Sequence, residues 1–289
     1  MDADGWLASG ERIELETDSG SWDVFVRTAG SGPWLTLLHG FPTSSWDWAR
    51  VAQLLEPSFQ MLTFDFLGFG DSDKPRDHEY SIGEQADLTE ALWRRLGIEE
   101  TGVVGHDYGA TVAQELLARA EEGTLEARLN GVALLNAGLY VELARPLLIQ
   151  HLLAAPLAGR LLAHLVTERA FSRSLSSVFS SEHQPTATEL HEHWQLVRNR
   201  GGVAVTPKLL RYMRERRANL ARWESALERT DVPLQLVWGM ADPRSGAHIA
   251  DHARQRIPNL GVVALDDVGH YPQLEAPEQV ATAIEAAFQ

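Results

Sequence analysis

The sequence lacks cysteine altogether, which excludes disulfide bridges, cysteine-ligated zinc and thiol nucleophiles. It also lacks any apolar run close to the roughly 20 residues that span a bilayer. The N-terminal stretch carries Asp2, Asp4 and Glu11, so its charge has the wrong sign for a signal peptide. We therefore expect a cytoplasmic protein.

Basic residues are few, because the 289 residues include 25 Lys and Arg against 40 Asp and Glu, a net charge of -15. Such a surface repels phosphate backbones and anionic lipids, so we expect neither a nucleic-acid nor a membrane partner. Tryptophan is frequent instead, and Trp46 and Trp194 are candidates to line an apolar pocket. We expect a monomer or homodimer that acts on a small apolar substrate.

Strand and helix patterns alternate over most of the chain. Strands are expected over residues 13–17, 22–28, 34–38, 61–65, 101–105, 131–135, 233–238 and 261–265, and helices over 45–55, 82–96, 110–120, 248–256 and 277–288. The first two strands form a short antiparallel pair around a turn at 18–21. The alternation that follows predicts an α/β fold with a mostly parallel, doubly wound sheet.

The middle of the chain contains helix patterns only. From residue 143 to about 227 the expected helices are broken at Pro156, Pro185, Gly201–Gly202 and Pro207. This predicts a helical cap over residues 140–225, inserted between two parts of one core, 1–139 and 226–289. Ligands of open α/β sheets bind at the carboxyl ends of the strands, so the cap is expected to form a lid there.

The run Gly105-His106-Asp107-Tyr108-Gly109 follows a strand and begins a helix. It has the small-x-nucleophile-x-small pattern of a nucleophile turn, with Asp as the nucleophile. The glycines are needed because side chains at those positions would collide with neighbouring backbone. The positive end of the following helix favours an ionised Asp107. The run alone leaves open a second interpretation, in which Asp107 only caps the helix.

Together with three further runs, this turn resembles the α/β-hydrolase superfamily, in the branch of epoxide hydrolases and haloalkane dehalogenases. The further runs are His39-Gly40-Phe41-Pro42, the residues 65–75 (DFLGFGDSDKP), and Gly269-His270-Tyr271-Pro272-Gln273. They occur in the order of the family and span nearly the whole chain. The resemblance implies an α/β-hydrolase fold with an inserted helical cap, no cofactor and no metal.

The resemblance also implies a catalytic triad. Asp107 would be the nucleophile and His270, in the loop after the last strand, the general base, which fits the family's order of nucleophile, acid and histidine. Asp242, directly after a strand, is the preferred acid that orients His270. The alternatives for the acid are Asp266, Asp267 and Glu142. By the same resemblance, the backbone amides of Phe41 and Tyr108 would form the oxyanion hole.

A carboxylate nucleophile suits displacement at saturated carbon, which leaves an alkyl ester on Asp107 for water activated by His270 to hydrolyse. The leaving group is then a halide or an epoxide oxygen. Dehalogenases of this branch hold the halide with side-chain N–H donors at the positions of Phe41 and Tyr108. Phe41 has no such donor and Tyr108 has only a hydroxyl, which counts against a haloalkane or haloacid dehalogenase.

An epoxide oxygen needs a proton donor, which epoxide hydrolases supply from cap tyrosines. Tyr212, on a helix expected to begin at Thr206-Pro207, resembles the second of these. It is equally compatible with packing on the apolar side of that helix. No tyrosine lies between Tyr140 and Tyr212, so Tyr140 is the possible second proton donor.

The sequence therefore favours an epoxide hydrolase. The alternatives are a dehalogenase with the same triad and a ligand-binding protein of this fold with weak or no turnover. The arginines of the late cap are expected to form a solvated helix face and not a nucleic-acid-binding patch; they are Arg211, Arg214, Arg216, Arg217 and Arg222.

Overall fold

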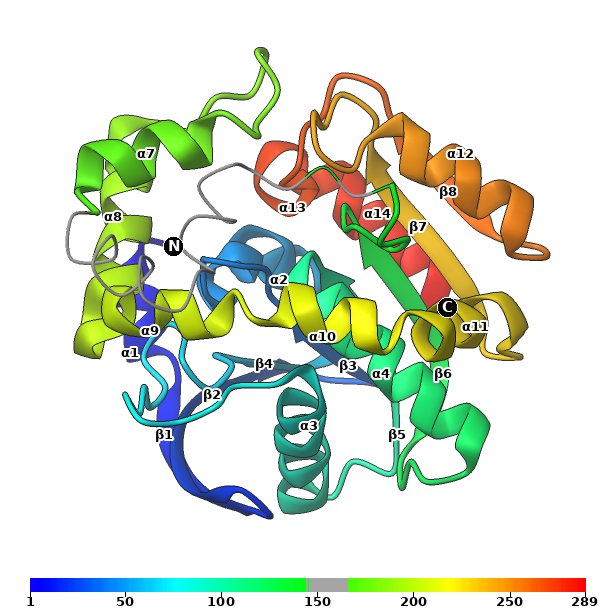
Figure 1. Cartoon of the computed structure of the whole chain (residues 1–289), viewed down its shortest axis with the longest axis horizontal. Helices are drawn as coiled ribbons and strands as arrows, with labels where there is room; N and C mark the ends of the chain where they lie inside the picture. Colours follow the sequence, from blue (N-terminus) through cyan, green and yellow to red (C-terminus); the bar gives the residue numbers. More distant parts are fainter. Residues whose placement is uncertain (144, 146–165) are drawn as a thin grey trace.

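The computed structural model describes residues 1–143, 145 and 166–289. An eight-stranded sheet, ordered β1-β2-β4-β3-β5-β6-β7-β8, crosses the molecule with helices on both sides (Figure 1). The strands are β1 (Glu11–Thr17), β2 (Gly20–Gly30), β3 (Trp34–Leu38), β4 (Gln60–Phe64), β5 (Glu100–His106), β6 (Arg128–Leu135), β7 (Leu234–Gly239) and β8 (Gly261–Leu265). β2 pairs antiparallel with β1 and β4, and all other pairs are parallel. The predicted α/β-hydrolase fold is confirmed.

The helices of the sheet part are α1 (Ala3–Ala8), η1 (a 3-10 turn, Ser45–Trp48), α2 (Ala49–Leu55), α3 (Ile82–Leu96), α4 (Tyr108–Glu122), α12 (Ala247–Arg256), α13 (Pro272–Glu275) and α14 (Pro277–Phe288). Local chemistry explains their ends: Ser81 caps α3 by accepting the Glu84 N–H, and Gly97 ends it in the left-handed conformation. α1 was not predicted, because six residues are too few to show a helical period.

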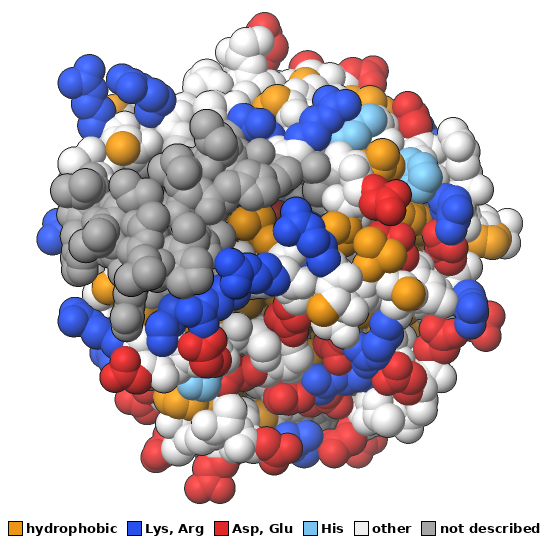
Figure 2. Space-filling view, viewed as in Figure 1, with side chains coloured by type: hydrophobic (Ala, Val, Ile, Leu, Met, Phe, Trp, Pro, Cys, Tyr) orange, Lys and Arg blue, Asp and Glu red, His pale blue; other side chains and the backbone are white. Residues whose placement is uncertain are grey.

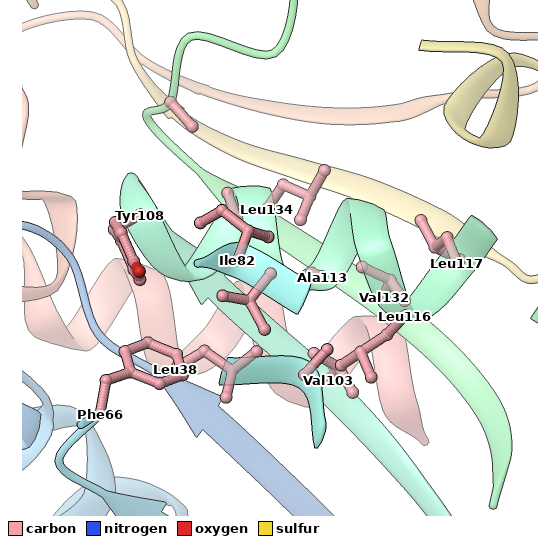
Figure 3. Close-up of a cluster of buried hydrophobic side chains, with 14 of the residues drawn as sticks. Leu38, Phe66, Ile82, Val103, Tyr108, Ala113, Leu116, Leu117, Val132 and Leu134 are labelled. Carbon is pink, nitrogen blue, oxygen red and sulfur yellow. The ribbon is translucent and has the colours of Figure 1, made fainter. Parts of the chain in front are cut away.

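Two apolar cores cover the sheet, one on each face. α3 and α4 pack together on one face, and α2 packs with α14 on the other. The central strands are covered on both sides, which explains why β3 and β5 are buried along almost their whole length and why β3 is mostly apolar. Figure 3 shows part of the first core, to which three neighbouring strands contribute Leu38, Val103 and Leu134 and α4 contributes Leu116.

Between β6 and β7, the described residues contain helices and no strand. They are α7 (Glu168–Ser176), α8 (Ala187–Arg198), η2 (Asn199–Gly201), α9 (Gly202–Leu209), α10 (Tyr212–Ala218) and α11 (Leu220–Arg229). α11 packs on α4, where the Trp223 Nε1–H donates to the Glu115 carboxylate at 2.7 Å. The predicted break at Pro156 lies outside the described residues. The division into core and cap at residues 140 and 225 stays a prediction.

The predicted start of a helix at Thr206-Pro207 was wrong. α9 begins at Gly202 and contains Pro207, while Tyr212 begins the separate helix α10. The reason is the glycine pair: Gly201 has φ of 81°, which turns the chain so that the helix starts before the proline. In the described part of the chain, no helix is both long and apolar enough to cross a bilayer.

Candidate active site

Asp107 stands in the tight turn between β5 and α4. Its φ of 46° and ψ of -103° lie in a region that residues other than glycine rarely adopt. A Cβ on Gly105 would come within 2.7 Å of the Gly109 carbonyl oxygen, and one on Gly109 within 2.4 Å of the Leu38 oxygen. The backbone packing therefore requires both glycines, as the run predicts.

The Asp107 carboxylate makes no capping hydrogen bond to α4, so the helix-cap interpretation was wrong. Its Oδ2 instead accepts the Phe41 N–H at 3.1 Å, across from the end of β3. Burial raises the pKa of Asp107, while His270 and the N–H groups of Phe41 and Tyr108 act in the opposite direction. Two backbone N–H groups and the positive charges of His270 and Arg216 thus favour the ionised carboxylate against the cost of burial.

His270 and Asp242 form a buried pair, with His270 Nδ1 and Asp242 Oδ2 2.7 Å apart. Burial acts to lower the pKa of His270, but the carboxylates of Asp242 and Asp107 outweigh it and raise the pKa to about 9. The alternative acids Asp266, Asp267 and Glu142 are exposed, and among the described residues only Asp242 pairs with the imidazole.

Three further groups hold the Asp242 carboxylate. The Asn136 Nδ2–H donates to Oδ2 at 3.0 Å, the Ser245 hydroxyl donates to Oδ2 at 2.7 Å, and the Arg244 N–H donates to Oδ1 at 2.7 Å. Burial acts to raise the pKa of Asp242, but His270 and the donors of Arg244 and Ser245 hold it well below the usual range. Sequence reasoning excludes Asn136 as the acid, because an amide carries no charge, but missed its role as a donor to Asp242; its signal was a polar residue directly after strand β6.

Glu275, also missed from the sequence, anchors the loop that carries His270. Its buried carboxylate accepts the N–H groups of Gly269 at 2.8 Å and Tyr271 at 3.1 Å, on either side of His270. It also accepts the Ser180 N–H at 3.0 Å, from the segment after α7. One carboxylate therefore fixes the imidazole's backbone to the helical part of the chain.

A cavity of about 370 Å³ brings Asp107, His270 and Tyr212 together. It lies between the residues that follow the strand ends and the helices α7 to α10. Its apolar wall includes Phe41, Val141, Phe171, Leu175, Val178, Trp194, Val197, Val203, Leu210 and Met213. Trp194 lines it as expected, whereas Trp46 lies outside and packs against His193 with ring centroids 4.6 Å apart.

Tyr212 opens α10 and is buried in the cavity wall, its ring centroid 6.4 Å from that of Phe41. Burial and the nearby Asp107 charge raise its pKa, so its hydroxyl keeps its proton. The Glu215 carboxylate fixes α10 by accepting the Ile82 N–H at the start of α3 at 2.7 Å. Both interpretations of Tyr212, packing and proton donation, are compatible with this position, because the packed ring also lines the cavity.

The side chains of Tyr108 and Tyr140, both named as site candidates from the sequence, point elsewhere. The Tyr108 side chain is fully buried in the core beside Phe66 and Ile82 (Figure 3), and only its backbone serves the site. The placement of Tyr140 as a second proton donor was wrong. Its ring turns toward α12 and packs on His252, with centroids 4.5 Å apart, outside the described cavity lining.

The expectation of a solvated arginine face was wrong for one residue. Arg211 pairs with Glu79 and Arg222 with Glu122 at the surface, as expected of such a face. Arg216, in contrast, is only 8% exposed and lines the cavity. Sequence reasoning missed it because arginines at neighbouring positions concealed which one faces inward. In the described ranges, no group of three His, Cys, Asp or Glu side chains is arranged to hold a metal ion.

Comparisons with known proteins agree with this architecture. The chain resembles the mesoderm-specific transcript protein most visibly in the runs Leu37–Trp48 and Tyr271–Glu275. The protein from Mus musculus is 40% identical over 279 residues, covering 94% of this chain and 83% of that protein, which confirms the resemblance. Haloalkane dehalogenase 2 of Mycobacterium tuberculosis is 26% identical over 283 residues, covering 94% and 93%.

Among solved structures, the epoxide hydrolase CorEH without ligand matches with a TM-score of 0.78 and 22% identity, covering 96% of this chain and 98% of that chain. At that identity the match concerns the fold alone. The family model described as the alpha/beta hydrolase fold matches residues 33–277. This chain therefore belongs to the α/β-hydrolase fold family.

Proposed function

We propose that this protein is a hydrolase that opens epoxides to vicinal diols through an ester formed on Asp107, without a cofactor. The proposal rests on the surroundings of the Asp107 carboxylate. Asp107 accepts the Phe41 N–H at 3.1 Å and shares a cavity with His270 and Tyr212. A carboxylate nucleophile, an imidazole base and a phenolic acid are the groups that this two-step reaction requires.

In the first step, an Asp107 oxygen attacks an epoxide carbon. The new C–O ester bond forms as the strained C–O bond breaks, and the leaving oxygen takes the Tyr212 proton. The phenolate is then reprotonated from His270, which is protonated near neutral pH because its pKa is about 9. The step therefore ends with a neutral imidazole and an esterified, uncharged Asp107.

In the second step, neutral His270 takes a proton from water as the water oxygen attacks the ester carbonyl of Asp107. The loss of the Asp107 charge helps, because that charge is one of the causes that raise the pKa of His270. The N–H groups of Phe41 and Tyr108 stabilise the oxyanion, and one such donor is typically worth about 10²–10³ in rate. On collapse the ester C–O bond breaks and the leaving oxygen takes the remaining proton of the added water, which releases the diol and restores the carboxylate and the imidazolium.

The first alternative is a haloalkane or haloacid dehalogenase with the same triad. Neither position expected to hold a halide offers a side-chain donor to the cavity, because Phe41 is apolar and the Tyr108 hydroxyl is buried in the core. The second alternative, a ligand-binding protein with weak turnover, is disfavoured by the cost of keeping Asp107, His270 and Asp242 buried together. A cytoplasmic location, a monomer or homodimer, and the lack of nucleic-acid or membrane partners stay predictions.

A panel of epoxides and haloalkanes, followed by one turnover in ¹⁸O-water with enzyme in excess, tests the proposal. We expect diol formation, and ¹⁸O in the Asp107 carboxylate by peptide mass spectrometry. Tyr212→Phe is expected to slow the opening of the epoxide by about 10²-fold or more, the usual worth of a general acid. Halide release without diol formation would favour the dehalogenase, and ¹⁸O found only in the product would refute the ester.

A further inference from the structure

Arg216 is a buried cation in the wall of the active-site cavity. It lies four residues after Tyr212 on α10, so the two side chains share one helix face. Only 8% of the residue is exposed, and it lines the cavity with Asp107. Its position is fixed, because Glu215 ties the other side of α10 to the start of α3.

The guanidinium of Arg216 has no carboxylate partner among residues 1–143, 145 and 166–289, within the 4.0 Å that defines an ion pair. The remaining residues, 144 and 146–165, include no Asp or Glu. Burial lowers the pKa of Arg216, while Tyr212 and the carboxylates of Asp107 and Glu224 act the other way, and neither carboxylate lies within ion-pair distance. An arginine stays protonated in proteins, so a positive charge with no ion-pair partner in the described chain faces the cavity.

The charge of the cavity is opposite to that of the chain. Arg145, Arg217 and Arg244 also line it, and Asp107 is the one acidic residue in the described lining, although Asp and Glu outnumber Lys and Arg by 40 to 25 overall. None of these arginines forms an ion pair within the described chain, and the buried Nε of Arg244 has no hydrogen-bond partner. Figure 2 shows Lys and Arg side chains gathered beside the grey atoms, over α9 and α10.

We propose that Arg216 binds a carboxylate of the substrate, so that the enzyme acts on epoxides that carry a carboxylic acid on an apolar chain. A guanidinium presents paired N–H donors that match the two oxygens of a carboxylate. The apolar wall around Phe171, Leu175 and Trp194 accommodates the hydrocarbon. The substrate class rests on the proposed epoxide hydrolase function, whereas the carboxylate site itself does not.

The binding experiment compares octanoate with 1-octanol, which has the same chain length and no charge, by calorimetry. Wild-type enzyme is expected to bind octanoate about 10- to 100-fold more tightly, the worth of one or two charge-assisted hydrogen bonds. Arg216→Gln is expected to abolish the preference. The matched control is Arg214→Gln, an exposed position on the same helix, which should leave the preference unchanged.

Two results overturn the proposal: wild-type enzyme that binds 1-octanol as tightly as octanoate, or a folded Arg216→Gln variant that keeps the preference. The wild-type comparison decides even if that variant does not fold. Arg216→Lys, which keeps the charge, should keep part of the preference, and its complete loss in a folded lysine variant would also contradict us.

Turnover separates this proposal from the proposed function. Wild-type enzyme should hydrolyse an epoxy alkanoate faster, at low concentration, than its methyl ester, and Arg216→Gln should remove the difference. A carboxylate preference in binding without hydrolysis of any epoxide would refute the epoxide hydrolase and leave the carboxylate site standing. Slower turnover of neutral epoxides in Arg216→Gln, with octanoate binding unchanged, would assign Arg216 to the leaving oxygen instead and refute the site.

Discussion

Gly109→Ala should disable catalysis without unfolding the protein. The added Cβ would lie 2.4 Å from the Leu38 carbonyl oxygen and 2.7 Å from that of His39. Ordinary contact begins at 3.4 Å, so the end of β3 must move by about 1 Å, a displacement that can cost about 10²-fold in rate. The Gly109 N–H also donates to the His39 oxygen at 3.0 Å, and this bond would be strained.

The expected movement carries the Phe41 N–H, three residues beyond the end of β3, away from the Asp107 carboxylate. We therefore expect hydrolysis of the Asp107 ester to slow by about 10²–10³, measured in single turnovers with the best epoxide substrate. Circular dichroism and thermal unfolding should show a folded protein. Gly83→Ala is the control, since its Cβ would meet nothing nearer than 3.9 Å, and it should keep full activity. Wild-type rates in Gly109→Ala would refute the reasoning.

Three further perturbations test other parts of the structure. The pKa of His270 is raised from 6.5 to about 9 in the folded protein. The difference in stability between wild type and His270→Gln should therefore be largest below pH 6.5 and shrink as the pH rises through 9, which thermal unfolding at a series of pH values would measure. Glu275→Gln should lower kcat with little change in KM, and should lower the free energy of unfolding measured in urea by about 1–3 kcal/mol. The exposed Glu278→Gln is the control and should have neither effect, and equal behaviour of the two variants would contradict the anchoring role. Leu116→Ala, at a fully buried position, should cost about 2–5 kcal/mol in the same titration, and a loss no larger than that of the 42% exposed Leu54→Ala would count against the packing described.

Helices and strands were predictable from the sequence where the hydrophobic pattern extends over many residues or where a capping residue marks the end of the element. The expected ranges 34–38, 82–96, 261–265 and 277–288 match β3, α3, β8 and α14. α3 shows why, because Ser81 and Gly97 mark both ends of an amphipathic run. The predicted start of α9 was wrong because Pro207 is a strong local signal for a helix start. Gly201 overrides this signal through a left-handed backbone conformation that the sequence alone does not show.

The candidate site was predictable where its chemistry is local in sequence. The glycines around Asp107 reveal a tight turn, and position relative to the strands suggests Asp242 and His270. The groups that support them were missed, because Asn136 and Glu275 act across contacts of remote segments. Arg216 was missed for a related reason: only the packing of α10 on α3 decides which arginine turns inward.

The attachment of the base loop to the segment after α7 restricts how ligands can reach the cavity. His270 donates its backbone N–H to the Val178 oxygen at 2.9 Å, and a Cβ on Gly269 would come within 2.5 Å of the Ser180 nitrogen. The two backbones therefore pack in direct contact. A shift of residues 178–180 would move the His270 imidazole away from Asp242 and Asp107. Substrate and product must therefore enter and leave the cavity without displacing this contact. Mutations intended to widen an entrance to the cavity should be made at other positions of its wall.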